Sequence, residues 1–187
     1  MACAIDLFLG FCIMEDKKGV LSMTKEEVLQ TLETLGITYT KVDHEAIETM
    51  DGLDKVEKQL NHRVAKNLFL TNRQKTRFYL LLTVGDKKFK TKELSHQINS
   101  ARLSFGSGED MERLLGCHPG SASILGLLND QEGKVQLLID EDLLQDDYIC
   151  AHPCFNTSTL KMKKDDVITI FLPYVKHDYI AVKLIGE

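Results

Sequence analysis

Apolar residues recur along this chain with two spacings, one typical of helices and the other typical of strands. Thr24 and Glu27 form a capping-box pattern ahead of apolar residues at helical spacing, and Gly36 marks the end of that helix. A second amphipathic helix is predicted from Met50 to Leu60. Three further helices are expected at Thr91–Ile98, at Gly108–Leu115 and from about Lys164 to Phe171.

Strands are predicted where apolar and β-branched residues form short runs between turn-forming residues. Val64–Leu70 and Phe78–Val84 flank the polar turn Thr71–Lys75 and should form an antiparallel hairpin. The second of these runs is almost continuously apolar, so we expect it to be a central strand that is covered on both faces. The remaining predicted strands are Ile37–Val42, Gly120–Leu128, Lys134–Ile139, Tyr148–Cys150, Thr157–Met162 and Tyr179–Leu184.

The order of these elements predicts a single α+β domain in which helices flank a mixed β-sheet. A length of 187 residues suits one domain, and no repeat, low-complexity tract or Pro/Gly-rich linker divides the chain. Residues 1–22 are assigned to an N-terminal extension, because the first capped helix begins only at Thr24. The apolar residues 1–14 contain Asp6 and are too short to span a bilayer, so we expect a soluble protein that is not bound to a membrane.

Charge and cysteine content narrow the functional classes. A formal net charge of −5 argues against a protein that coats DNA or another duplex, but not against one that grips the end of a single RNA. Lysines gather in two groups, which taken alone are typical of solvated surface. The groups are Lys87, Lys88, Lys90 and Lys92, and Lys161, Lys163 and Lys164. The odd number of cysteines, 5, without a disulfide-framework spacing favours a reducing compartment, and therefore the cytoplasm.

Three segments place polar groups where plain scaffold would not need them. They are Lys66-Asn67, Pro119-Gly120-Ser121 and His152-Pro153-Cys154-Phe155-Asn156-Thr157. The first interrupts an apolar strand, where a charge is costly to bury, although an edge-strand lysine could instead reach water. The second predicts a turn whose backbone amides could bind an anion, or an ordinary connection. The third is either a functional loop or a hydrogen-bonded loop that closes a sheet edge.

Metal and covalent chemistries fit these segments poorly. A zinc deaminase needs Pro-Cys-x-x-Cys, whereas Thr157 stands where the second cysteine would follow Pro153-Cys154. No spacing of the CxxC type supplies four zinc ligands. A nucleophilic pair of Cys154 and His152 is conceivable, although neighbours in sequence seldom place both groups correctly. We therefore expect a site without metal or organic cofactor, and keep a thiol-dependent hydrolase as an alternative.

Together and in this order, the three segments resemble those of the YbaK/ProX family of aminoacyl-tRNA editing proteins. The likeness is to the free-standing, prolyl-tRNA-synthetase-associated type, which clears Ala-tRNA(Pro), and it extends from about Thr24 to Leu184. The similar segments are Lys66-Asn67-Leu68-Phe69-Leu70, Pro119-Gly120-Ser121 through Leu128-Asn129-Asp130, His152-Pro153-Cys154-Phe155-Asn156, and Val42-Asp43-His44, where the family often has a histidine. Ile124 and Ala151 depart from the family pattern at positions that affect the shape of the pocket.

The resemblance implies a curved mixed sheet flanked by helices, with the editing domain at residues 23–187. The implied catalytic residues are Lys66, Asn67 and His152, gathered in one pocket. The implied substrate-binding residues are Pro119, Gly120, Ser121, Asn156 and Thr157, without a metal.

The implied activity is hydrolysis of the ester that joins a wrong amino acid to tRNA, with Ala-tRNA(Pro) as the expected substrate. The expected partner is the acceptor end of tRNA(Pro), with prolyl-tRNA synthetase as a second candidate. Two alternatives remain on the same fold. One is a Cys-tRNA(Pro) deacylase, and the other is a non-catalytic RNA-binding or regulatory module.

Overall fold

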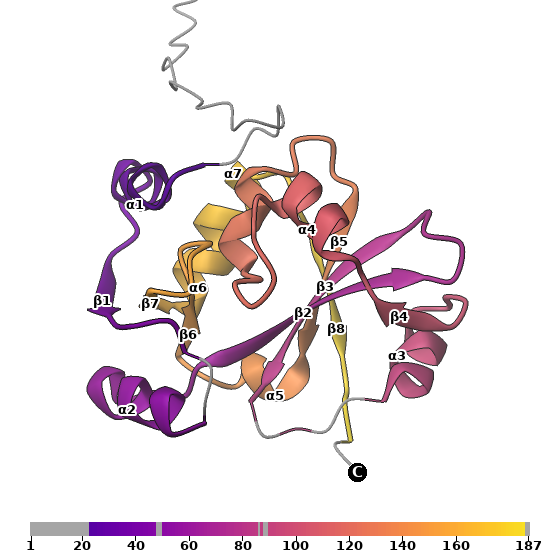
Figure 1. Ribbon diagram of the computed structural model, residues 1–187, viewed down its shortest axis with the longest axis horizontal. Coiled ribbons are helices and arrows are strands. Elements are labelled where there is room, and N and C mark those ends of the chain that lie inside the picture. Colours follow the sequence, from indigo (N-terminus) through magenta and orange to yellow (C-terminus); the bar gives the residue numbers. More distant parts are fainter. Residues whose placement is uncertain (1–22, 48–49, 86, 88–89, 186–187) are drawn as a thin grey trace, which may run out of the picture.

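Two β-sheets contribute to one large hydrophobic core in the computed structural model, which describes residues 23–47, 50–85, 87 and 90–185 (Figure 1). The smaller sheet has the strand order β1-β7-β6, and the larger sheet has the order β4-β2-β3-β5-β8. The strands are β1 Tyr39–Asp43, β2 Ala65–Asn72, β3 Phe78–Val84, β4 Leu103–Phe105, β5 Val135–Asp140, β6 Tyr148–Ala151, β7 Ser158–Lys163 and β8 Tyr179–Val182. The predicted extension at residues 1–22 lies outside the described residues.

The larger sheet is mixed, as the pattern of elements predicted. β2 and β3 form an antiparallel hairpin, whereas β5 runs parallel to both β3 and β8. Every residue of β3 is buried, which confirms the prediction of a central strand covered on both faces. The α+β fold with helices around a mixed sheet is therefore confirmed.

Helices cover the two faces of the larger sheet unequally (Figure 1). They are α1 Lys25–Thr34, α2 Met50–Leu60, α3 Thr91–Gln97, α4 Gly108–Leu115, η1 Ile124–Leu128, α5 Glu141–Leu144, α6 Lys164–Asp166, η2 Val167–Phe171 and α7 Leu172–Tyr174. Residues of α1, α4, η1 and η2 belong to the larger core, and α3 packs on the opposite face in a second core. Among the described residues, no helix is long and apolar enough to cross a membrane.

The predicted capping box begins α1. The Thr24 hydroxyl oxygen accepts a hydrogen bond from the Glu27 backbone N–H at 3.2 Å, and the Glu27 carboxylate accepts one from the Thr24 N–H at 2.7 Å. These reciprocal bonds satisfy donors that a helix start leaves unpaired. Gly36, at a φ of 71°, follows the helix in the left-handed conformation that glycine adopts without steric cost.

The prediction of a strand at Gly120–Leu128 is wrong, because Ile124–Leu128 forms the 3₁₀-helix η1. The Ser123 hydroxyl caps it by accepting a hydrogen bond from the Leu125 N–H at 3.1 Å. Gly126 allows a close approach to α4, since a Cβ there would lie 2.8 Å from the Leu115 carbonyl oxygen. A short, fully buried apolar run lacks the periodicity that would separate a strand from a helix.

Candidate functional site

Asn67 lies in β2, and His152 directly follows β6. These strands belong to different sheets but contact each other. Side chains alternate along β2, so Asn67 shares its face with Ala65 and Phe69, which belong to the larger core. Ala151 ends β6 in the same core, and His152 follows it directly. The structure thus brings a strand amide and a loop imidazole to the same side of the larger sheet.

Two atoms of this pair are buried without a hydrogen-bond partner among the described residues. They are Asn67 Oδ1 and His152 Nε2. Asn67 Nδ2 donates to the Ala65 carbonyl oxygen at 2.9 Å, which fixes the amide so that Oδ1 remains an acceptor. An unsatisfied buried polar atom costs about 1–3 kcal/mol, so native proteins rarely keep one unless it has a use.

The imidazole of His152 is neutral near pH 7. Burial, together with the neighbouring His44, lowers the pKa of His152 to about 4. The two rings lie 6.1 Å apart between centroids and are tilted by 57°. A perturbed histidine with an open ring nitrogen is the kind of group that gathers at functional sites.

His44 is itself held at both ring nitrogens. Nδ1 lies 2.7 Å from the Glu45 carbonyl oxygen, and Nε2 lies 2.9 Å from the Thr159 hydroxyl. Because a carbonyl oxygen only accepts, Nδ1 carries the hydrogen, and in the neutral ring Nε2 accepts from Thr159. His44 is therefore held in a fixed position beside His152, where it helps to lower the pKa of His152.

Ser123 connects the backbone of His152 to η1. Its hydroxyl donates to the His152 carbonyl oxygen at 2.5 Å while it caps η1. Sequence reasoning did not single out Ser123, although a serine directly before an apolar run is a recognisable helix-cap signal.

Asn156 and Thr157 connect the same loop to the segment after β1. The Asn156 side chain donates to the Ile47 carbonyl oxygen at 3.1 Å and accepts from the Ile47 N–H at 3.4 Å. The Thr157 carbonyl oxygen accepts from the His44 N–H at 3.0 Å, and its side chain is exposed. Both residues thus hold the loop of His152 against the segment of His44.

The Pro119-Gly120-Ser121 segment forms a turn after α4. Pro119 packs over Gly108, where a Cβ would lie 2.9 Å from the proline ring. Gly120 has a φ of 88° and open space around its Cβ position, so the turn exposes backbone. The Ser121 hydroxyl donates to the His118 carbonyl oxygen at 2.8 Å, so this hydroxyl closes the turn.

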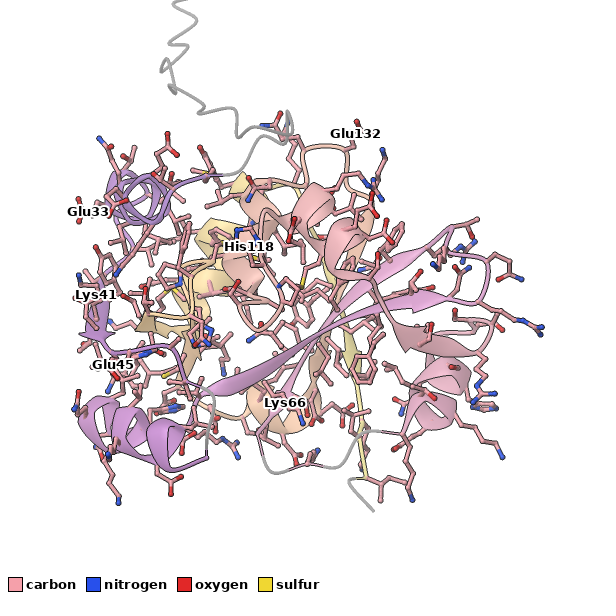
Figure 2. The ribbon with its side chains drawn as sticks, viewed as in Figure 1. Glu33, Lys41, Glu45, Lys66, His118 and Glu132 are labelled. Carbon is pink, nitrogen blue, oxygen red and sulfur yellow. The ribbon has the colours of Figure 1, made fainter. Side chains whose placement is uncertain are left out.

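Lys66 lies on the face of β2 opposite Asn67. It pairs across the hairpin with Thr83, whereas Asn67 pairs with Leu82, and Leu68 on the lysine face packs against the second core. Lys66 is exposed, and Figure 2 shows it on one side of β2 with His118 on the other. The structure therefore does not bring Lys66 to the face that holds Asn67 and His152.

The structure bears on both the thiol-dependent mechanism and metal binding. A hydrogen bond with Cys117, together with complete burial, raises the pKa of the Cys154 thiol well above its usual range. A buried thiol that stays protonated is a poor nucleophile, which argues against the thiol-dependent alternative. Within the described ranges, no group of three or more His, Cys, Asp or Glu side chains is arranged to hold a metal ion.

Comparisons with known proteins identify the family of this chain. Residues 44–170 match the sequence profile described as the aminoacyl-tRNA editing domain. The "Prolyl-tRNA editing protein ProX" of Acetoanaerobium sticklandii is 29% identical over 143 residues, which cover 76% of this chain and 87% of that protein. The mouse "Prolyl-tRNA synthetase associated domain-containing protein 1" is 27% identical, over 86% of this chain and 96% of its own.

A solved structure shares the fold. It is the crystal structure of a candidate trans-editing enzyme for prolyl tRNA synthetase, with a TM-score of 0.63 and 15% sequence identity. The superposition covers 87% of this chain and 98% of the other.

Proposed function

Because the chain belongs to the aminoacyl-tRNA editing domain family, we propose that it hydrolyses the ester between a wrongly attached amino acid and tRNA. The observation that carries this proposal is the pair of buried, unpartnered atoms Asn67 Oδ1 and His152 Nε2. The name of the relative from Acetoanaerobium sticklandii, a prolyl-tRNA editing protein, supports tRNA(Pro) as the substrate. We propose Ala-tRNA(Pro) as the preferred substrate and prolyl-tRNA synthetase as a second partner.

Asn67 is proposed to hold the substrate's amino group. Its Oδ1 is an acceptor with a fixed orientation, and the α-ammonium group of an aminoacyl ester is a charged donor. A hydrogen bond to a charged group contributes about 1.5–3 kcal/mol, which is enough to orient the ester. This contact would satisfy the amide oxygen that is buried without a hydrogen-bond partner among the described residues.

His152 is proposed to orient the attacking water through Nε2. Because its pKa is about 4, the ring is a weak base near pH 7, but a dependable neutral hydrogen-bond partner. An aminoacyl ester is already activated, so positioning the water supplies much of the needed acceleration. The Pro119-Gly120 turn, with its exposed backbone, is proposed as one wall of the pocket.

Selection is proposed to work by exclusion of the larger, correct amino acid. One methylene changes binding in an apolar pocket by only about 1–3 kcal/mol, so a synthetase rejects a smaller amino acid poorly. A second pocket too narrow for proline but open to alanine solves this problem. Cysteine and serine are the small competitors against which alanine must be compared.

The proposal is tested by offering purified protein tRNA(Pro) charged with alanine, cysteine, serine or proline. Alanine should be released fastest and proline spared, and Asn67→Ala and His152→Ala should each lose activity. Lys55→Ala, at an exposed position on α2, serves as the control variant. Faster release of cysteine would identify the Cys-tRNA(Pro) alternative. RNA binding without release of any amino acid would refute the hydrolase and favour the non-catalytic alternative.

A further inference from the structure

Two cysteine thiols that the proposed hydrolysis does not use meet in the larger core. Cys117 lies between α4 and the Pro119-Gly120 turn, and Cys154 lies two residues after His152. The two cysteines are only 0% and 1% exposed, and their thiols are hydrogen-bonded to each other. We call them the thiol pair. The pair joins the segment proposed as a wall of the pocket to the segment proposed to orient the attacking water.

Contacts with η1 bring the same two segments together. A Cβ on Gly126 would lie 3.0 Å from Cys117 Sγ, so this sulfur packs directly against η1. The loop of Cys154 is held at the start of η1, because the Ser123 hydroxyl donates to the His152 carbonyl oxygen. Both cysteines belong to the larger core. The contact between the thiols therefore follows from the packing of both segments around one helix.

The two segments differ in how firmly the fold holds them. Cys117 follows Gly116, which ends α4 and packs so closely that a Cβ there would lie 2.7 Å from the Asn129 amide nitrogen. Cys154 lies in the loop between β6 and β7 and has a left-handed φ of 63°. Glycine adopts this conformation without steric cost, whereas for a cysteine it is strained. The loop of Cys154 is therefore the segment that moves when the two sulfurs are drawn together.

We propose that Cys117 and Cys154 form a site of reversible oxidation, at which hydrogen peroxide converts the two thiols into a disulfide and switches off hydrolysis. In the first step, the Cys154 sulfur attacks one peroxide oxygen, the O–O bond breaks, and a sulfenic acid forms. In the second step, the Cys117 sulfur attacks the sulfenic sulfur, the S–O bond breaks, and the disulfide forms. Each leaving hydroxide takes the proton of the attacking thiol. Two thiols are thus oxidised while one peroxide is reduced to two waters.

Burial makes the first step slow and dependent on opening of the loop. A thiolate reacts with peroxide, whereas a buried, protonated thiol does not. Loops at functional sites open locally at a lower free energy than core strands and helices, and such opening exposes Cys154 to water and peroxide. When the loop closes again, Cys117 lies beside the oxidised sulfur, so the disulfide forms before oxidation proceeds further.

The disulfide acts on hydrolysis through the position of His152. Bonded sulfurs lie about 2.05 Å apart, closer than hydrogen-bonded atoms, which stay about 2.5 Å or more apart. The link therefore draws the loop of Cys154 toward Cys117 and displaces His152, two residues away. A displacement of about 1 Å lowers an enzymatic rate by about 10²-fold. The loss of hydrolysis rests on the proposed function, whereas formation of the disulfide does not.

The test uses the full chain with Cys3→Ser and Cys12→Ser, so that only the three cysteines within the described structure remain. Hydrogen peroxide is added at increasing concentration, and disulfides are located by peptide mapping with mass spectrometry. We expect a link between Cys117 and Cys154. The rate of Ala-tRNA(Pro) hydrolysis should fall at least about tenfold as the link forms, and dithiothreitol should restore it.

Cys150 is the control within the same molecule. It is 0% exposed, like Cys117, but its Sγ has an imidazole nitrogen as its neighbour, His62 Nδ1 at 3.8 Å. It should remain a thiol at peroxide concentrations that link the pair. Cys154→Ala should form no internal disulfide and should keep its activity at those concentrations. Mapping of the unsubstituted pair decides the matter if this variant does not fold.

The inference is overturned if Cys150 is oxidised before the pair is linked. It is also overturned if the linked protein hydrolyses at the reduced rate, or if dithiothreitol fails to restore the lost activity. A protein that forms the link but releases no amino acid even when reduced keeps the oxidation site and refutes the proposed function. A protein that hydrolyses the ester but never forms the link does the reverse.

Discussion

His152 combines burial and a lowered pKa with a ring nitrogen that has no hydrogen-bond partner among the described residues. We expect His152→Ala to lower the rate of Ala-tRNA(Pro) hydrolysis by roughly 10²-fold or more, the scale of losing a group that handles the attacking water. Stability should change little, because the lost packing is offset by removal of a buried, unsatisfied nitrogen. Single-turnover rates and urea unfolding measure both effects. His96→Ala, at an exposed histidine on α3, is the control.

If His152 orients the attacking water as proposed, its pKa should set the acid limit of activity. If the neutral ring orients water, kcat/KM should rise with pH through about 4, the pKa of His152, and then level off. Replacing the neighbouring imidazole in His44→Gln should remove its contribution to the lowered pKa of His152 and move this limb to higher pH. The pH profile of kcat/KM, taken where circular dichroism shows a folded protein, checks this shift. An unmoved limb would contradict the role of His44.

Cys154 should be dispensable for the chemistry. Its thiol is buried, and its pKa is raised by Cys117 and by burial, so Cys154→Ala should keep most of the hydrolytic rate. Exhaustive chelation with EDTA should also leave the rate unchanged, since the mechanism proposed above uses no metal. Loss of activity in Cys154→Ala with an intact fold would favour the thiol mechanism. Loss with EDTA that zinc restores would contradict a metal-free site.

At the scale of single residues, the sequence indicates the type of residue at a position better than the direction of its side chain. Lys66 and Asn67 were recognised because polar groups interrupt an apolar strand. Their placement in one pocket did not allow for the alternation of side chains along a strand, which puts consecutive residues on opposite faces. The bond from Ser123 to the His152 carbonyl and the fixed position of His44 both come from contacts between distant segments. Residue type alone does not predict such contacts.

At the scale of elements, the sequence predicts those helices and strands whose formation depends on interactions between neighbouring residues. The capped helix α1, the amphipathic helix α2 and the β2–β3 hairpin all follow from caps, periodicity and turn residues. The 3₁₀-helix η1 was mistaken for a strand, because tertiary packing against α4 decides its conformation. The short elements β4 and α5 have too few residues to show a period.

The contact between η1 and the loop of His152 gives a prediction at this scale. Ser123→Ala removes a hydroxyl that bonds both the His152 carbonyl and the Leu125 N–H, leaving buried backbone groups unpaired. The free energy of unfolding should fall by about 1–3 kcal/mol. The kcat should fall as well, because His152 loses its backbone anchor.

Gly126→Ala is the matched control, since its new Cβ overpacks the same helix and has Leu115 and Cys117 as its nearest neighbours. It should destabilise by a similar amount, about 1–3 kcal/mol, with a smaller loss of kcat. Equal losses of kcat in the two variants would show that Ser123 acts only through stability.

At the scale of the whole molecule, a buried pair of side chains, Asp130 and His177, joins the segment after η1 to the chain after α7. His177 Nε2 lies 3.0 Å from Asp130 Oδ2, and Nδ1 lies 2.7 Å from the Val175 carbonyl oxygen. Both partners of the ring accept hydrogen bonds, so the geometry favours a doubly protonated, cationic His177 beside an ionised carboxylate. Their side chains are 4% and 1% exposed, so water screens the pair little.

This pair makes the stability of the whole domain depend on pH. The hydrogen bond to Asp130 raises the pKa of His177 above 6.5, although burial opposes it. Burial alone would raise the pKa of Asp130, but hydrogen bonds from His177, Lys134 and Val135 lower it below 3.8. The contribution of His177 is therefore complete below pH 6.5 and is lost as pH rises through its folded pKa, whereas that of Asp130 is lost in acid.

His177→Gln should separate this contribution from every other titrating group. The amide can still donate to Asp130 but carries no charge, so the variant should be least stable relative to wild type near pH 5.5, between the two reference values of 3.8 and 6.5. The difference should shrink as pH rises above the folded pKa of His177, because the wild type then loses its cation as well. Other groups, including His152, titrate equally in both proteins and cancel. Urea unfolding at a series of pH values measures this difference, and a difference that stays constant with pH would contradict a charged His177.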